Sequence, residues 1–138
     1  MGRWTAVSQA ILLDTSVFIA LETSRGVRAD PTTWDMRISP VTLAELKAGV
    51  LSATNNEHRL VRLRTVEMAV EIPLLAIDEW VADEWAALRS WLADVGRRLD
   101  VNDLWIAATA IRYGMPVVTQ DNDFFVISGV RGLEVIQV

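Results

Sequence analysis

Acidic residues stand at four places along the chain from which their carboxylates could act together: Asp14, Glu45, Asp103 and Asp121. Asp14 directly follows the apolar run 10–13, and Asp121 follows the apolar segment 115–119. A carboxylate so close to an apolar core has to be neutralised by a cation or another partner. Magnesium prefers such oxygen ligands, and a bound divalent ion activates water and offsets the charge of a phosphoryl transition state. The pattern therefore favours metal-dependent hydrolysis.

Each acid also has an ordinary structural interpretation when it is taken alone. Asp14 can simply end a strand, and Asp103 can be an acid that stabilises the dipole of a helix at its first turn. Asp121 and Asp123 can be loop residues, and Glu45 can be a solvated position on a helix. The chemical interpretation therefore depends on several of these carboxylates meeting in space.

The chain of 138 residues has no cysteine and a single histidine, His58. The lack of cysteine excludes thiolate catalysis, disulfides and cysteine-based zinc sites, and it suits a reducing, cytoplasmic environment. One histidine cannot build a histidine-rich metal site, and we expect His58 on a helix surface and not as a general base. Hydrolytic chemistry in this chain must then rely on carboxylates.

The elements that would position these acids alternate between strands and helices. We predict strands at 10–14, 36–39, 71–77, 115–119 and 133–138, and helices at 17–22, 41–51, 57–70, 79–95 and 104–113. Thr15 and Ser16 are expected to cap the first helix, and residues 101–103 the last. Such alternation is typical of a single α/β domain with a parallel sheet sandwiched between helices, and helix 104–113, apolar nearly all round, would be its central packed helix.

Ligands of an open parallel sheet bind beyond the carboxyl ends of its strands. Asp14, Asp103 and Asp121 should therefore converge at one end of the sheet. Glu45 joins them only if its helix crosses that same end. No apolar run approaches the length of a membrane-spanning helix, which is about 20 residues, so we expect no membrane association.

Four segments carry a resemblance to a known family: LLDTSVFI at 12–19, SPVTLAELKAG at 39–49, NDLWIAA at 102–108 and VTQDNDF at 118–124. In this order and spacing they resemble the motifs of PIN-domain nucleases, and most of all those of the VapC toxins of bacterial VapBC toxin–antitoxin modules. The resemblance extends over 10–138, which would be the PIN domain, and residues 1–9 would then be an N-terminal extension.

The resemblance implies roles for individual residues. The acidic quartet that holds Mg²⁺ or Mn²⁺ in the family corresponds to Asp14, Glu45, Asp103 and Asp121. Asp123 is an alternative or outer ligand, and Thr15 and Thr119 match small hydroxyl positions that orient ligands. The implied activity is hydrolysis of RNA phosphodiester bonds, with transfer or ribosomal RNA as substrate. The implied partners are a second copy of the chain, in a homodimer, and a VapB-type antitoxin, in a heterotetramer or larger complex.

The charge of the chain, −5 from 13 basic and 18 acidic residues, argues by itself against a general nucleic-acid-binding protein. Setting aside the four candidate acids leaves 13 basic against 14 acidic residues, so most of the excess negative charge belongs to the candidate site. Arg97 and Arg98, just upstream of Asp103, are the pair we expect to contact RNA phosphates. A solvated arginine surface is the alternative interpretation.

A catalytically silent PIN-like module that only binds RNA or a protein partner is the other functional hypothesis. Its signature would be the loss of one of the four acids, and all four are present. A phosphoaspartate enzyme of the haloacid-dehalogenase type would instead want an acid at Ser16, and a dinucleotide-binding domain would want a G-x-G-x-x-G motif, which the sequence lacks.

Overall fold

Four parallel strands form the sheet of this protein, whose computed structural model describes residues 9–30 and 33–138. The strands are β1 (Ala10–Leu13), β2 (Asp35–Arg37), β3 (Val117–Thr119) and β4 (Val135–Gln137). They lie side by side in the order β2-β1-β3-β4, with Leu12 of β1 paired to Arg37 on one side and to Val117 on the other. The predicted parallel α/β class is confirmed.

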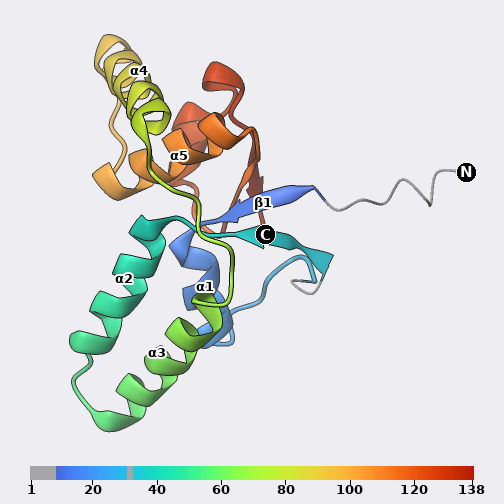
Figure 1. The fold of residues 1–138 in the computed structure, drawn as a ribbon, viewed down its shortest axis with the longest axis vertical. Coiled ribbons are helices and arrows are strands. Elements are labelled where there is room, and N and C mark those ends of the chain that lie inside the picture. Colours follow the sequence, from blue (N-terminus) through green and yellow to red (C-terminus); the bar gives the residue numbers. More distant parts are fainter. Residues whose placement is uncertain (1–8, 31–32) are drawn as a thin grey trace, which may run out of the picture.

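Helices cover both faces of the sheet (Figure 1). They are α1 (Thr15–Glu22), α2 (Pro40–Leu51), α3 (Asn56–Ala69), α4 (Glu79–Val95) and α5 (Val101–Tyr113), with the short 3-10 helices η3 (Asp123–Ile127) and η4 (Val130–Gly132) after β3. Side chains alternate between the faces of a strand, and in β1 Ile11 and Leu13 pack in one core cluster with α1 and α3. Leu12 packs in the other cluster, with α4 and α5. The fold is therefore a three-layer sandwich.

Helix α5 is the packed helix that the sequence predicts. Residues 106–110 have no solvent exposure, and the rest of its buried face lies against α4, where the rings of Trp85 and Trp105 stack with their centroids 5.1 Å apart. The helix ends at Gly114, which adopts a left-handed φ of 67°. This firm packing holds the first turn of α5, which carries Asp103, at a set place relative to the sheet.

The two helix starts nearest the candidate acids differ from the prediction. Helix α1 begins at Thr15, and its cap is Asp14 in place of the predicted Thr15 and Ser16. Helix α5 begins at Val101 with Asp100 as its cap, whereas residues 101–103 were the predicted cap. In both cases a carboxylate accepts a backbone N–H of the first turn, which is a preferred way to satisfy a helix start. Asp14 thereby lies both at the end of β1 and at the start of α1.

The strand predicted at 71–77 is wrong. In the described structure this segment makes a single parallel bridge, between Leu74 and Ile38. The N–H of Ile38 donates to the Pro73 carbonyl, and the N–H of Leu75 donates to the Ile38 carbonyl. Pro73 has no N–H to extend the ladder, and β2 has already ended at Arg37, so the segment passes along the edge of the sheet as an extended connection.

Other elements match the prediction within a few residues. The strand predicted at 36–39 runs from Asp35 to Arg37, and the last strand covers 135–137 of the predicted 133–138. His58 is exposed on α3, as expected. The predicted N-terminal extension falls on residues 1–8, outside the described residues, and on Gln9. Within the described ranges no helix has the length and apolar character needed to cross a lipid bilayer.

Candidate active site

Asp14 lies at the carboxyl edge of the sheet, between its two central strands. Its backbone N–H donates to the carbonyl of Val118 on β3, at 2.9 Å, so the chain leaving β1 runs alongside the chain leaving β3. The side chain is only 3% exposed. Burial raises the pKa of the Asp14 carboxyl, against the hydrogen bonds from Ser16, Thr119 and Thr15 that lower it.

Two hydroxyl groups hold the Asp14 carboxylate in place. Ser16 Oγ donates to Asp14 Oδ2 at 2.6 Å, and Thr119 Oγ1 donates to the same oxygen at 3.0 Å. Each hydroxyl also accepts a backbone N–H of the loop after β3, Ser16 from Gln120 and Thr119 from Asp121. The start of α1 is thus tied to the loop that carries Asp121.

Glu45 reaches the same place from α2. That helix is capped by the fully buried Ser39, whose hydroxyl accepts the N–H of Val41, and Pro40 follows in its first turn. Thr15 Oγ1 lies 2.7 Å from Glu45 Oε1, and its single proton goes to this carboxylate because a charged acceptor forms the stronger bond. The helix that carries Glu45 therefore does cross the carboxyl end of the sheet, the condition that the sequence left open.

Asp103 lies in the first turn of α5, and the negative charges of nearby acids act on its carboxyl. Burial, first, and then the negative charges of four neighbours together raise the pKa of its carboxyl to about 7: Asp14, Asp100, Asp123 and Glu45. The pKa of Asp121 is also raised, first by burial and then by Asp14 and Asp123, with Arg25 opposing the shift. The structure therefore brings all four predicted acids into one electrostatic cluster, together with Asp123.

The donor atoms of this carboxylate cluster suit a divalent cation. Its donors are all oxygen atoms, the kind that Mg²⁺ and Mn²⁺ take, and burial of like charges leaves negative charge that a cation would neutralise. In the described part of the chain no three carboxylate or histidine groups lie close enough to enclose an ion by themselves. Magnesium commonly binds through one or two carboxylates and keeps several waters, so the donor set fits this ion without a closed cage.

Sequence reasoning missed two residues of this site. The sequence predicts Ser16 only as a helix cap, whereas in the structure its hydroxyl contacts Asp14 and the loop after β3. Asp100 was not singled out, although it caps α5 and adds negative charge beside Asp103. A hydroxyl two residues after a strand-ending acid, and an acid three residues before another in a helix start, are the signals that would have found them.

The predicted RNA-contacting pair, Arg97 and Arg98, lies in the connection between α4 and α5. Both side chains are exposed. Arg98 lines a cavity of about 380 Å³ together with Leu99, Asp100 and Asp123, at the border of the carboxylate cluster. Arg98 is therefore a neighbour of the carboxylate cluster, and contact of either arginine with RNA stays a prediction.

Comparison with known proteins agrees with this arrangement. Residues 11–130 match the family described as PIN domain. The chain is 44% identical to Ribonuclease VapC5 of Mycobacterium tuberculosis over 92% of its own length and 94% of the relative. It is 43% identical to Ribonuclease VapC4 of the same organism, over 82% and 87% of the two chains. A solved structure of VapBC-5, a toxin–antitoxin system of Mycobacterium tuberculosis, matches with a TM-score of 0.83 and 42% identity over 94% of this chain and 99% of that chain.

Proposed function

Because this chain belongs to the PIN-domain family and, within it, to the VapC ribonucleases, we propose that it is a metal-dependent endoribonuclease that acts as the toxin of a toxin–antitoxin pair. The observation that carries the proposal is the cluster formed by Asp14, Glu45, Asp103 and Asp121 at the carboxyl edge of the sheet. Relatives that share this family over most of the chain are named ribonucleases. We further propose that transfer or ribosomal RNA is the substrate.

Asp14, Asp103 and Asp121 would be the ligands of a Mg²⁺ or Mn²⁺ ion, with Glu45 acting directly or through a water. A divalent cation bound there supplies a Lewis acid that activates water and offsets the charge developing on the phosphoryl group. Thr119 and Ser16 keep the Asp14 carboxylate in one orientation through their hydrogen bonds to Oδ2. Thr15 does the same for Glu45.

No side chain of the cluster is placed to act as the nucleophile. The hydroxyl protons of Thr15, Ser16 and Thr119 are engaged with carboxylates, which fits ligand positioning and not attack on phosphorus. His58 is exposed on α3, where its Nδ1 lies 3.4 Å from Asn55 Nδ2. Water is therefore the proposed nucleophile, and hydrolysis would leave a 5′-phosphate and a 3′-hydroxyl.

The direct test uses antitoxin-free protein incubated with total bacterial RNA and Mg²⁺ or Mn²⁺, with EDTA as the control. New 5′ ends are mapped by sequencing. We expect discrete cleavage sites that disappear with EDTA, and their positions would name the RNA. RNA binding without new ends, in either metal, would instead favour the catalytically silent binding module.

A VapB-type antitoxin is the proposed partner, and an apolar groove between α1 and α3 is its proposed docking surface. The groove measures about 280 Å³ and is lined in part by Leu21, Val61 and Met68. These three side chains are 37–45% exposed. Together they form an exposed apolar patch, which commonly marks an interaction site. The matching VapBC-5 structure is of a toxin–antitoxin system. We also propose that the chain forms a homodimer, as its family resemblance implies.

Met68→Asp is expected to weaken binding of the cognate antitoxin by about tenfold or more, because a buried interface anchor is replaced by a charge. RNA cleavage should stay at the wild-type rate, since α3 contributes no residue to the carboxylate cluster. Leu51→Asp, at an 84% exposed apolar position at the end of α2, is the matched control. Titration calorimetry measures the affinity, and equal affinities of the two variants would count against this groove.

A further inference from the structure

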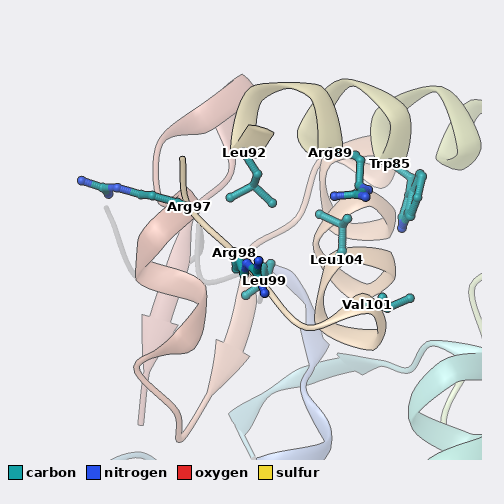
Figure 2. Close-up of a pocket in the computed structure, with 8 residues that line it drawn as sticks. All are labelled: Trp85, Arg89, Leu92, Arg97, Arg98, Leu99, Val101 and Leu104. Atoms are coloured by element: carbon teal, nitrogen blue, oxygen red, sulfur yellow. The ribbon is translucent and has the colours of Figure 1, made fainter. Parts of the chain in front are cut away.

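Another cavity lies between α4 and the start of α5 (Figure 2). Its volume is about 490 Å³, within the range of roughly 300–1,000 Å³ that small-ligand pockets occupy. Its wall combines cationic and apolar side chains, chiefly Trp85, Arg89, Arg97, Arg98, Leu99 and Leu104. No acidic residue lines it. We call it the arginine cavity.

Among the residues that the structure describes, the three arginines of this cavity have no anionic partner. In residues 9–30 and 33–138 the ion pairs are made by other arginines, Arg37, Arg112 and Arg131. The guanidinium groups of Arg89, Arg97 and Arg98 also make no hydrogen bond to other described residues. Figure 2 shows the Arg97 side chain directed away from the other residues of the wall, so Arg89 and Arg98 are the cations whose positive potential attracts an anion to this hollow.

The apolar side chains of the wall lie next to one of its arginines. Trp85 and Arg89 are one helical turn apart on α4 and so face the same side, and Figure 2 shows both above Leu104 of α5. The buried indole N–H of Trp85 has no acceptor in the described part of the chain. An occupant that brings phosphate oxygens together with a less polar portion matches such a wall.

The arginine cavity adjoins the carboxylate cluster. Arg98 and Leu99 line it and also line the smaller cavity that contains Asp100 and Asp123. Asp100 and Asp123 are two of the acids whose charge acts on Asp103. An RNA strand whose scissile phosphate lies at the carboxylate cluster can therefore continue along the protein surface, over Arg98, into the arginine cavity.

We propose that the arginine cavity binds the phosphate–ribose backbone of the RNA strand beside the bond that is cut, with Arg89 and Arg98 as its phosphate contacts. The guanidinium fork suits phosphate geometry, and the leucine and tryptophan wall accommodates the sugar. This inference rests on the proposed function, because it takes RNA as the occupant. It keeps Arg98 of the arginine pair that the sequence suggested and adds Arg89 and the tryptophan wall.

The test measures binding of a fluorescein-labelled ten-nucleotide oligoadenylate RNA in EDTA, where no cleavage occurs, over a range of NaCl concentrations. The double variant Arg89→Gln/Arg98→Gln should lower the affinity about tenfold at low salt. Each phosphate neutralised on a single strand contributes about 0.7 to the slope of log affinity against log salt, so the slope should fall by about 1.4. Lys47→Gln, an exposed cation on α2, is the control and should leave both quantities unchanged.

The outcomes separate this inference from the proposed function. An affinity and slope equal to wild type in Arg89→Gln/Arg98→Gln would overturn it, as would a loss no larger than that of Lys47→Gln. A change in oligomeric mass of the double variant, measured by light scattering, would assign the cavity to a second copy of the chain and overturn it as well. Wild-type protein that binds RNA through these arginines but never cleaves it with Mg²⁺ or Mn²⁺ would support the cavity and refute only the nuclease.

Discussion

Asp14→Asn is expected to lower the rate of RNA cleavage by at least about 100-fold, the scale seen when a metal site loses the charge or orientation of a ligand. The amide keeps the size of the side chain and removes its negative charge. Asparagine is also as good a helix cap as aspartate, and its carbonyl oxygen can still accept from Ser16 or Thr119, which contact Asp14 in the wild type. The fold should therefore survive.

The measurement compares initial cleavage rates at saturating Mg²⁺ for wild type, Asp14→Asn and the control Asp83→Asn, which removes an exposed acid on α4. Circular dichroism checks that all three proteins are folded. Cleavage by Asp14→Asn at the rate of the control, at the same sites, would show that the activity belongs to a contaminant or to another part of the chain.

Asp103→Asn should separate activity from stability. The Asp103 carboxyl is part-buried among four negative neighbours, which together with burial raise its pKa to about 7. Without a metal ion, this charge destabilises the fold, and the neutral amide removes it. At pH 8 in EDTA we expect Asp103→Asn to melt about 3 °C or more above wild type, the shift that about 1 kcal/mol produces in a domain of this size. Its RNA cleavage should fall to the level of Asp14→Asn.

The pH dependence gives an independent check of the same charge. A carboxyl whose pKa is higher in the folded state binds its proton more tightly there than in the unfolded chain. The stability of the metal-free wild type should therefore fall as the pH rises from about 4, near the ordinary aspartate pKa of 3.8, towards 7. Asp103→Asn should show a flatter profile, and Mg²⁺ should raise the melting temperature of wild type more than that of the variant. A variant less stable than wild type at pH 8 would mean that Asp103 is a structural acid.

Local chemistry explains why the sequence predicts so much of the fold. Apolar runs, Pro40 at a helix start and Gly96 and Gly114 at helix ends determine most elements within a few residues, because these signals act through neighbours along the chain. The order of strands and helices then leads to a parallel sandwich. The strand predicted at 71–77 fails for a non-local reason, since β2 ends before it can supply a partner beyond Ile38.

For the site, the sequence by itself determined which acids are available. It also determined that Asp14 and Asp121 share an edge of the sheet, because each follows a strand. Whether Glu45 joins them was decided only by tertiary structure, because the direction of α2 depends on its packing and on the contact with Thr15. The same holds for the role of Ser16 and for the charge that Asp100 adds beside Asp103. Hydrogen bonds and charge interactions between residues distant in the chain follow from how the elements pack, and no spacing along the sequence contains that information.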